Sequence, residues 1–100
     1  MSGILSPTDL KTFARDGVVC LRGVIAPALL DILARGIDEC LTQPGPKGRN
    51  FNADGTPGRF AGDVFMWTFN ANIRRFVREC PLGEIAATAM NSRRAMLMLD

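Results

Sequence analysis

Apolar positions recur at helical spacing in four stretches of this chain. The first begins at Ser6, a good N-cap, with Pro7 at the first helical position and Asp9 completing a capping box. Gly17 ends the stretch, because glycine adopts a left-handed backbone without steric cost. The pattern predicts a short capped helix whose apolar face consists of Leu10, Phe13 and Ala14.

A second helix is predicted to begin near Pro27 and to end before residues 44–46. Those residues are Pro-Gly-Pro, which cannot continue a helix. Gly36 lies inside this helix and costs it about 1 kcal/mol relative to alanine. Close packing against another element would explain a glycine there. The apolar stripe consists of Leu29, Leu30, Leu33, Ile37 and Leu41.

Two shorter helices are predicted in the second half of the chain. Asn70 or Asn72 caps the first of them, and Pro81 separates it from the other. Asn91-Ser92 is a suitable C-terminal stop. The two apolar stripes consist of Ile73, Phe76, Val77 and Cys80, and of Leu82, Ile85, Ala86, Ala89 and Met90.

Two apolar runs have the propensity of strands. Residues 18–24 follow the turn at Asp16-Gly17, and residues 96–99 read as a strand buried on both faces. Two strands without further partners are marginal, and their unpaired edges allow self-association. We therefore expect residues 1–100 to be a single partial domain that is incomplete in this chain.

Residues 43–59 contain prolines and glycines and show no apolar periodicity. They predict a long flexible loop. Connections of this length are uncommon in compact domains and are often lids or binding loops. A plain surface excursion is the alternative, and the sequence leaves both open.

Composition narrows the classes of function. The net charge of +2 is too small to indicate nucleic acid or an anionic membrane. The N-terminus lacks the basic and apolar stretches of a signal peptide, and no apolar run approaches the roughly 18 residues of a membrane span. Cys20, Cys40 and Cys80 are widely spaced and fit reduced, mostly buried thiols in a cytoplasmic protein.

Several segments, taken in order, resemble the N-terminal third of the phytanoyl-CoA dioxygenase family. The early part is the capped helix that leads through Asp-Gly to an apolar run. The resemblance covers nearly all of the chain. Its segments are Leu5 to Leu10, Phe13, Asp16 to Val19, Leu21 to Val24, Gly58 to Trp67, Pro81 to Ala87 and Met90 to Ser92.

The resemblance implies an α+β fold: a mainly helical N-terminal flank plus the first strands of a double-stranded β-helix (jelly-roll). Family members hydroxylate organic molecules with Fe(II), 2-oxoglutarate and O2, and two His and one carboxylate hold the iron. The family places these ligands beyond the strand that residues 95–99 resemble, and this chain has no histidine. We therefore expect no cofactor in this chain and no activity from it alone, whereas the complete enzyme would act on a small or lipid-like substrate.

The substrate-side candidates are Arg59, Asp63 and Trp67, which fall at i, i+4 and i+8. On a helix they would share one face and could line a substrate entrance, with arginine holding an anion and tryptophan stacking on an apolar group. The alternative is that Trp67 belongs to the core and Arg59 pairs with Asp63 at the surface.

The remaining charged groups favour structural roles. Asp38 and Glu39 are adjacent on a helix and point in different directions, so they form no acid–base dyad. Five arginines near the end of the chain form a basic group that could bind phosphates or nucleic acid. Their positions are better suited to solvated helix faces and helix C-termini. We expect no nucleic-acid or membrane partner. This group consists of Arg74, Arg75, Arg78, Arg93 and Arg94.

The absent histidines and the four amphipathic stripes also motivate a second hypothesis. In it, the chain is a non-catalytic small helical interaction module, or a remnant of an enzyme, that is stable as written.

Overall fold

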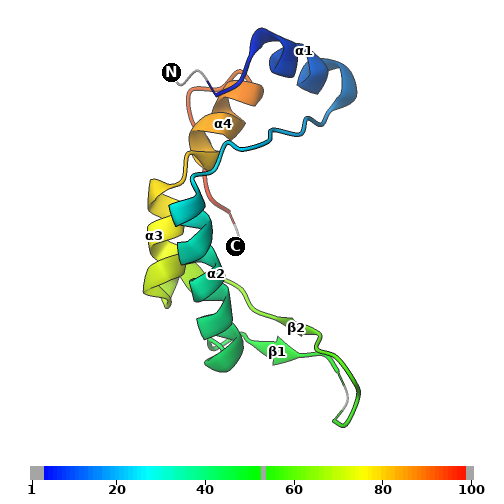
Figure 1. The fold of residues 1–100 in the computed structure, drawn as a ribbon, viewed down its shortest axis with the longest axis vertical. Coiled ribbons are helices and arrows are strands. Elements are labelled where there is room, and N and C mark those ends of the chain that lie inside the picture. The colour runs from blue at the N-terminus through cyan, green and yellow to red at the C-terminus, as the bar shows by residue number, and fades with distance from the viewer. Residues whose placement is uncertain (1–3, 53, 99–100) are drawn as a thin grey trace. The chain divides into compact units, whose positions relative to one another are not determined.

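The computed structural model of the chain describes residues 4–52 and 54–98. The chain divides into two compact units. The first contains α1 and α4, and the second contains α2, β1, β2, the short 3-10 helix η1 and α3 (Figure 1). The elements are α1 (Pro7–Asp16), α2 (Pro27–Thr42), β1 (Arg49–Asn50), β2 (Ala61–Gly62), η1 (Met66–Thr68), α3 (Ala71–Glu79) and α4 (Leu82–Ala89).

The caps of α1 confirm the prediction. The Ser6 hydroxyl accepts from the Asp9 N–H at 3.1 Å, and the Ser6 N–H donates to the Asp9 carboxylate at 2.9 Å. Gly17 has a φ of 73°, and its N–H donates to the Phe13 carbonyl at 2.8 Å. Side chain and glycine thus satisfy backbone groups at both ends of the helix.

The predicted stop of α4 is also confirmed. Asn91 adopts a left-handed backbone with a φ of 53°, which asparagine tolerates better than most residues. Its N–H donates to the Thr88 carbonyl at 3.1 Å, and the Ser92 N–H donates to the Ala87 carbonyl at 2.8 Å. This pair of bonds is a Schellman motif, which satisfies carbonyls of the last turn.

The two predicted apolar strands are wrong over the residues that the structure describes. Residues 18–24 form no strand and leave Val18 67% exposed. Residues 95–98 form no strand either, and Met96 and Met98 are each 89% exposed, while Leu99 lies outside the described residues. Apolar residues favour burial, but a strand also needs a neighbour for its backbone groups, and neither run has one among the described segments.

The expected burial of the cysteines holds only in part. None of the three cysteines forms a disulfide, and Cys80 is buried, Cys40 half-buried and Cys20 exposed. Cys20 is exposed because it belongs to the extended segment after α1, which forms no sheet.

In the second unit, α2 and α3 pack side by side, and Gly36 lies at their contact (Figure 1). A Cβ at Gly36 would lie 2.7 Å from Ile73 Cδ1 and 2.9 Å from Ile73 Cγ1. Close packing therefore explains the helical glycine, as the sequence suggested. Ile73 and Phe76 of α3 are buried, as is Met66 of η1.

The predicted loop at residues 43–59 is partly structured, which corrects that prediction. Strands β1 and β2 form an antiparallel ribbon in which Arg49 pairs with Gly62 and Asn50 with Ala61. The Phe51 N–H extends the pairing to the Phe60 carbonyl at 2.6 Å. Gly55 and Gly58 have positive φ angles of 80° and 82°, so glycine allows the chain to reverse there.

The longest helix, α2, has 16 residues. Across the described part of the chain, no helix combines the length and apolar character needed to cross a bilayer.

Candidate functional site

The chain leaves α2 through a turn at residues 44–48, and Asp63 binds that turn from the returning segment. One Asp63 oxygen accepts from the Gly45 N–H at 2.7 Å and the other from the Val64 N–H at 2.9 Å. A Cβ at Gly48 would lie 2.5 Å from Pro44 Cβ and 2.9 Å from Asp63 Oδ2. The turn therefore requires glycine at this position, where the carboxylate approaches the backbone closely.

Arg59 makes the second contact at the base of the ribbon. Its guanidinium donates to the Leu41 carbonyl in the last turn of α2. Carbonyls there lack intrahelical partners, and a cation is favoured at that end of the helix dipole. Arg59 and Asp63 thus tie the returning segment to the end of α2.

The predicted helical face of Arg59, Asp63 and Trp67 does not form, which corrects that expectation. Residues 59–65 contain β2 and irregular chain, and only Trp67 lies in a helical turn, η1. The surface alternative is wrong as well, because Arg59 and Asp63 bind backbone groups and form no ion pair with each other. Trp67 is half-buried. A role for these three residues beside a substrate stays a prediction.

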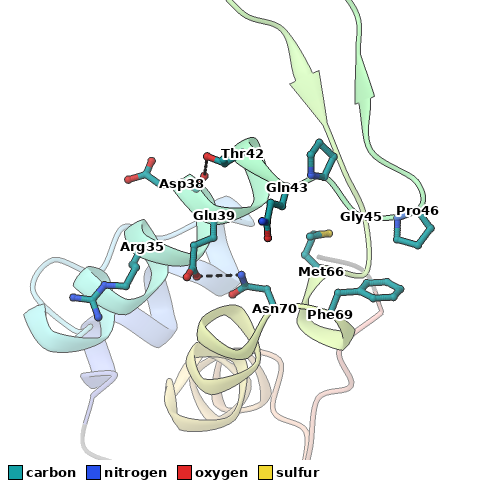
Figure 2. A pocket seen from close by; sticks show the side chains of 11 residues that line it. Arg35, Asp38, Glu39, Thr42, Gln43, Gly45, Pro46, Met66, Phe69 and Asn70 are labelled. Atoms are coloured by element: carbon teal, nitrogen blue, oxygen red, sulfur yellow. Dashed lines mark hydrogen bonds between the residues drawn. The ribbon is translucent and has the colours of Figure 1, made fainter.

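An open groove of about 740 Å³ lies at the C-terminal half of α2. We call it the α2 groove (Figure 2). The turn after α2, η1 and the start of α3 complete it. Polar residues on its wall include Asp38, Glu39 and Asn70, and apolar residues include Pro44, Met66 and Phe69.

Glu39 is the most constrained charge of this groove. The Asn72 side-chain amide donates to Glu39 Oε1 at 2.7 Å, and the Asn70 amide donates to the same oxygen at 3.1 Å. These hydrogen bonds, Asn72 first and Asn70 second, lower the pKa of Glu39; desolvation opposes them and the charge of Arg35 adds a smaller lowering. Figure 2 shows Glu39 directed at Asn70 and Asp38 directed away, as predicted for neighbours on a helix.

Sequence reasoning missed this contact between α2 and α3. The sequence offers Asn70 and Asn72 as alternative caps; Asn70 is the cap, and Asn72 lies within α3. Asn70 Oδ1 accepts from the Ile73 N–H at 2.9 Å, which caps α3, while both side-chain amides bind Glu39. The available signal was the repeat Asn-x-Asn at a helix start opposite a helix with a carboxylate.

Replacing Glu39 with glutamine is expected to lower the thermal midpoint at neutral pH and to have little effect in acid. The pKa of Glu39 is lower in the folded chain than its ordinary value of 4.5, so the folded state disfavours protonation. The stabilisation is therefore present above pH 4.5 and is lost as the pH falls through the lowered pKa. Thermal unfolding of both proteins over that range measures the difference.

The matched control for this titration is Asp38→Asn, which removes the same charge from the same helix. A difference between wild type and Glu39→Gln that stays constant across the pH range would contradict the proposed role of the Glu39 charge.

Two of the five arginines in the predicted basic group make internal contacts. Arg74 donates to the Trp67 carbonyl at 2.9 Å and to the Thr68 carbonyl at 2.7 Å, at the end of η1. Arg75 pairs with Glu79 four residues later on α3. These contacts favour the structural interpretation of both side chains over a phosphate site.

The described residues offer no set of side chains that could hold iron. Within the described residues, no three His, Cys, Asp or Glu side chains gather in a way that could hold a metal ion. The facial triad of the resembled family also requires two histidines, and the sequence has none.

The site is thus a Pro/Gly turn held by Asp63, with Arg59 bound to the end of α2 and the α2 groove beside the turn. What it does has to be argued from these residues. Comparison of the chain with protein-family models, with curated proteins and with solved structures found no match.

Proposed function

We propose that this chain is the helical N-terminal flank of a phytanoyl-CoA-dioxygenase-like oxygenase. The complete enzyme would be cytoplasmic and would use Fe(II), 2-oxoglutarate and O2 to hydroxylate a small or lipid-like molecule. The ordered resemblance in sequence carries this proposal. The capped helix that ends at a left-handed Gly17 supports the proposal, whereas the strand expected after Gly17 does not form.

Burial supports a role as a flank rather than as a self-contained enzyme. The most buried side chain of the described core is that of Leu5, at 6% exposure, and none falls below 2%. Large exposed apolar side chains often mark surfaces that another part of a protein covers. The most exposed of them are Val18, Phe51, Phe60, Phe69, Met90, Met96 and Met98.

The chain's own contribution would be to shape the edge of a substrate mouth. Arg59 and Asp63 hold the base of the ribbon through backbone contacts, so we propose that they position the ribbon rather than touch substrate directly. Trp67 is still the residue that we propose contacts an apolar group of the substrate. The iron and 2-oxoglutarate ligands would come from outside these 100 residues.

The reading frame after the codon for Asp100 tests the enzymatic proposal. An in-frame His-x-Asp within a few tens of residues is the expected result, with a second histidine further on. A stop codon at that point, or a continuation without His-x-Asp, would contradict it.

The exposed apolar side chains also suit the second candidate, a non-catalytic helical interaction module. Expression of residues 1–100 distinguishes the two functions. A flank should show a broad, weakly cooperative unfolding transition and exposed apolar surface that binds dyes, as incompletely packed chains do. A sharp cooperative transition would favour the module. Under both candidates, titration with Fe(II) should show no tight stoichiometric binding.

A further inference from the structure

The ribbon carries a second cavity of about 600 Å³ that none of the roles above uses. We call it the ribbon groove. It lies entirely within the second unit, and its volume falls in the range of small-molecule sites. The residues that matter to the argument are Lys47, Arg49, Phe51, Gly62 and Asp63.

An aromatic ring forms one wall of this groove. Phe51 lies over Gly62, where a Cβ would come within 3.1 Å of the ring atom Cε2. Phe60 supports the same ring from the facing strand, with ring centroids 5.0 Å apart and planes inclined by 60°. Phe51 is nevertheless 57% exposed, so part of its ring is open to a ligand.

Two cations line the same groove as this ring. The Lys47 ammonium lies 6.0 Å from the centroid of Phe65, within the range of a cation–π contact. Arg49 is the first residue of β1 and pairs across the ribbon with Gly62. Among the ion pairs of the described segments, none involves Lys47 or Arg49.

Asp63 is the one carboxylate among the groove residues, and the turn already uses it. Each of its oxygens accepts a backbone N–H, from Gly45 and from Val64. Two cations against one carboxylate leave the groove with a net charge of +1. Neither cation is in an ion pair with another described residue, and both line the groove together with the exposed Phe51 ring, whereas the bound carboxylate lies at the turn.

We propose that the ribbon groove binds a small anionic molecule with a flat apolar body, such as an aryl sulfonate, carboxylate or phosphate. Lys47 and Arg49 hold the anion through charge-assisted hydrogen bonds, and the Phe51 ring stacks on the flat body. A nucleic acid fits less well, because single-strand binders follow the backbone with an extended basic track. This site rests on the ribbon's own geometry and is independent of the oxygenase proposal.

Naphthalene-2-sulfonate is a suitable probe, since it joins a planar ring to a fixed negative charge. Titration into the isotopically labelled 100-residue chain should move the amide resonances of Gly48 and Gly62 saturably. The expected dissociation constant is about 1 mM, which ligands of this size commonly reach. The neutral analogue 2-naphthalenemethanol should bind several times more weakly, and added salt should weaken only the sulfonate.

Variants separate the groove from general surface charge. Lys47→Gln and Arg49→Gln should each weaken sulfonate binding by up to about fivefold, the scale of an exposed charge contact. Phe51→Leu should weaken the sulfonate and the neutral analogue alike. The matched control is Arg78→Gln, which removes one exposed positive charge from α3 and should leave binding unchanged.

Four results would overturn the proposal. Arg78→Gln could weaken binding as much as Lys47→Gln, or the neutral analogue could bind as tightly as the sulfonate. A short oligothymidylate could bind far more tightly than the probe, which would indicate a nucleic-acid surface. Saturable shifts that are absent from Gly48 and Gly62 would show that the probe does not bind in this groove.

Discussion

Replacing Gly36 with alanine is expected to destabilise the packing of α2 on α3 by up to about 2 kcal/mol. Overpacking a tight contact costs about 1–3 kcal/mol, and the better helix propensity of alanine returns about 1 kcal/mol. The new Cβ would lie 2.7 Å from Ile73 Cδ1, 2.9 Å from Ile73 Cγ1 and 3.2 Å from Asn70 Oδ1. Rotation about χ2 could move Cδ1 away but leaves Cγ1 in place, and χ1 of isoleucine is restricted in a helix.

A second helical glycine provides a control for which the opposite change in stability is expected. Gly83 lies in α4, and a Cβ there would meet nothing within 4 Å. Gly83→Ala should therefore stabilise the chain by about 0.4–1 kcal/mol, because alanine has less freedom to lose on folding. Denaturant unfolding followed by circular dichroism measures both variants.

A rescue variant tests the cause of the Gly36→Ala effect. Ile73→Ala removes both isoleucine atoms that the new Cβ would meet, so the double variant should lose less stability than the two single changes added together. The expected coupling is about 1 kcal/mol. Strict additivity would show that the loss does not come from the contact between Gly36 and Ile73.

Replacing Asn70 with alanine is expected to cost about 1–2 kcal/mol, because this side chain both caps α3 and binds Glu39 of α2. Loss of an N-cap costs about 0.5–2 kcal/mol, and Asn70 caps α3 through the Ile73 N–H. The same amide also donates to Glu39 on α2. Unfolding midpoints and the helix content of the variant measure the loss.

Asn72→Ala is the matched comparison for this change. Asn72 also donates to Glu39, with the shorter distance of 2.7 Å, but the Ile73 N–H binds Asn70 instead. The Asn72 variant should therefore lose less stability than the Asn70 variant. Equal losses would mean that the contact with Glu39, rather than the cap, dominates.

The helices could be predicted from the sequence because their signals are local. Ser6 and Asp9 lie within one turn of each other, and Gly17 and Asn91 have the backbone freedom that a helix end requires. Gly36 marked a close contact, although the sequence could not name Ile73 as its partner. That partner lies 37 residues further on, and nothing local connects the two.

The ribbon and the two grooves could not be predicted, because they depend on contacts between residues that are far apart in the sequence. Strands of two residues are too short to show an alternating pattern, and the surrounding glycines and prolines look like those of any loop. The face expected for Arg59, Asp63 and Trp67 assumed a helix that the chain does not form. Phe65 has a φ of 59°, a conformation that an aromatic residue seldom adopts and that tertiary contacts must impose.

The two contacts at the base of the ribbon have a consequence for the entropy of the folded chain. Leu41 to Arg59 and Gly45 to Asp63 each bring together residues 18 positions apart. Closing a flexible segment of that length costs about 2–3 kcal/mol. Once either contact has formed, the partners of the other are already held near one another at a high effective concentration. The two contacts therefore share one closure cost, so the ribbon can tolerate the transient opening of either contact while the other holds the segment closed.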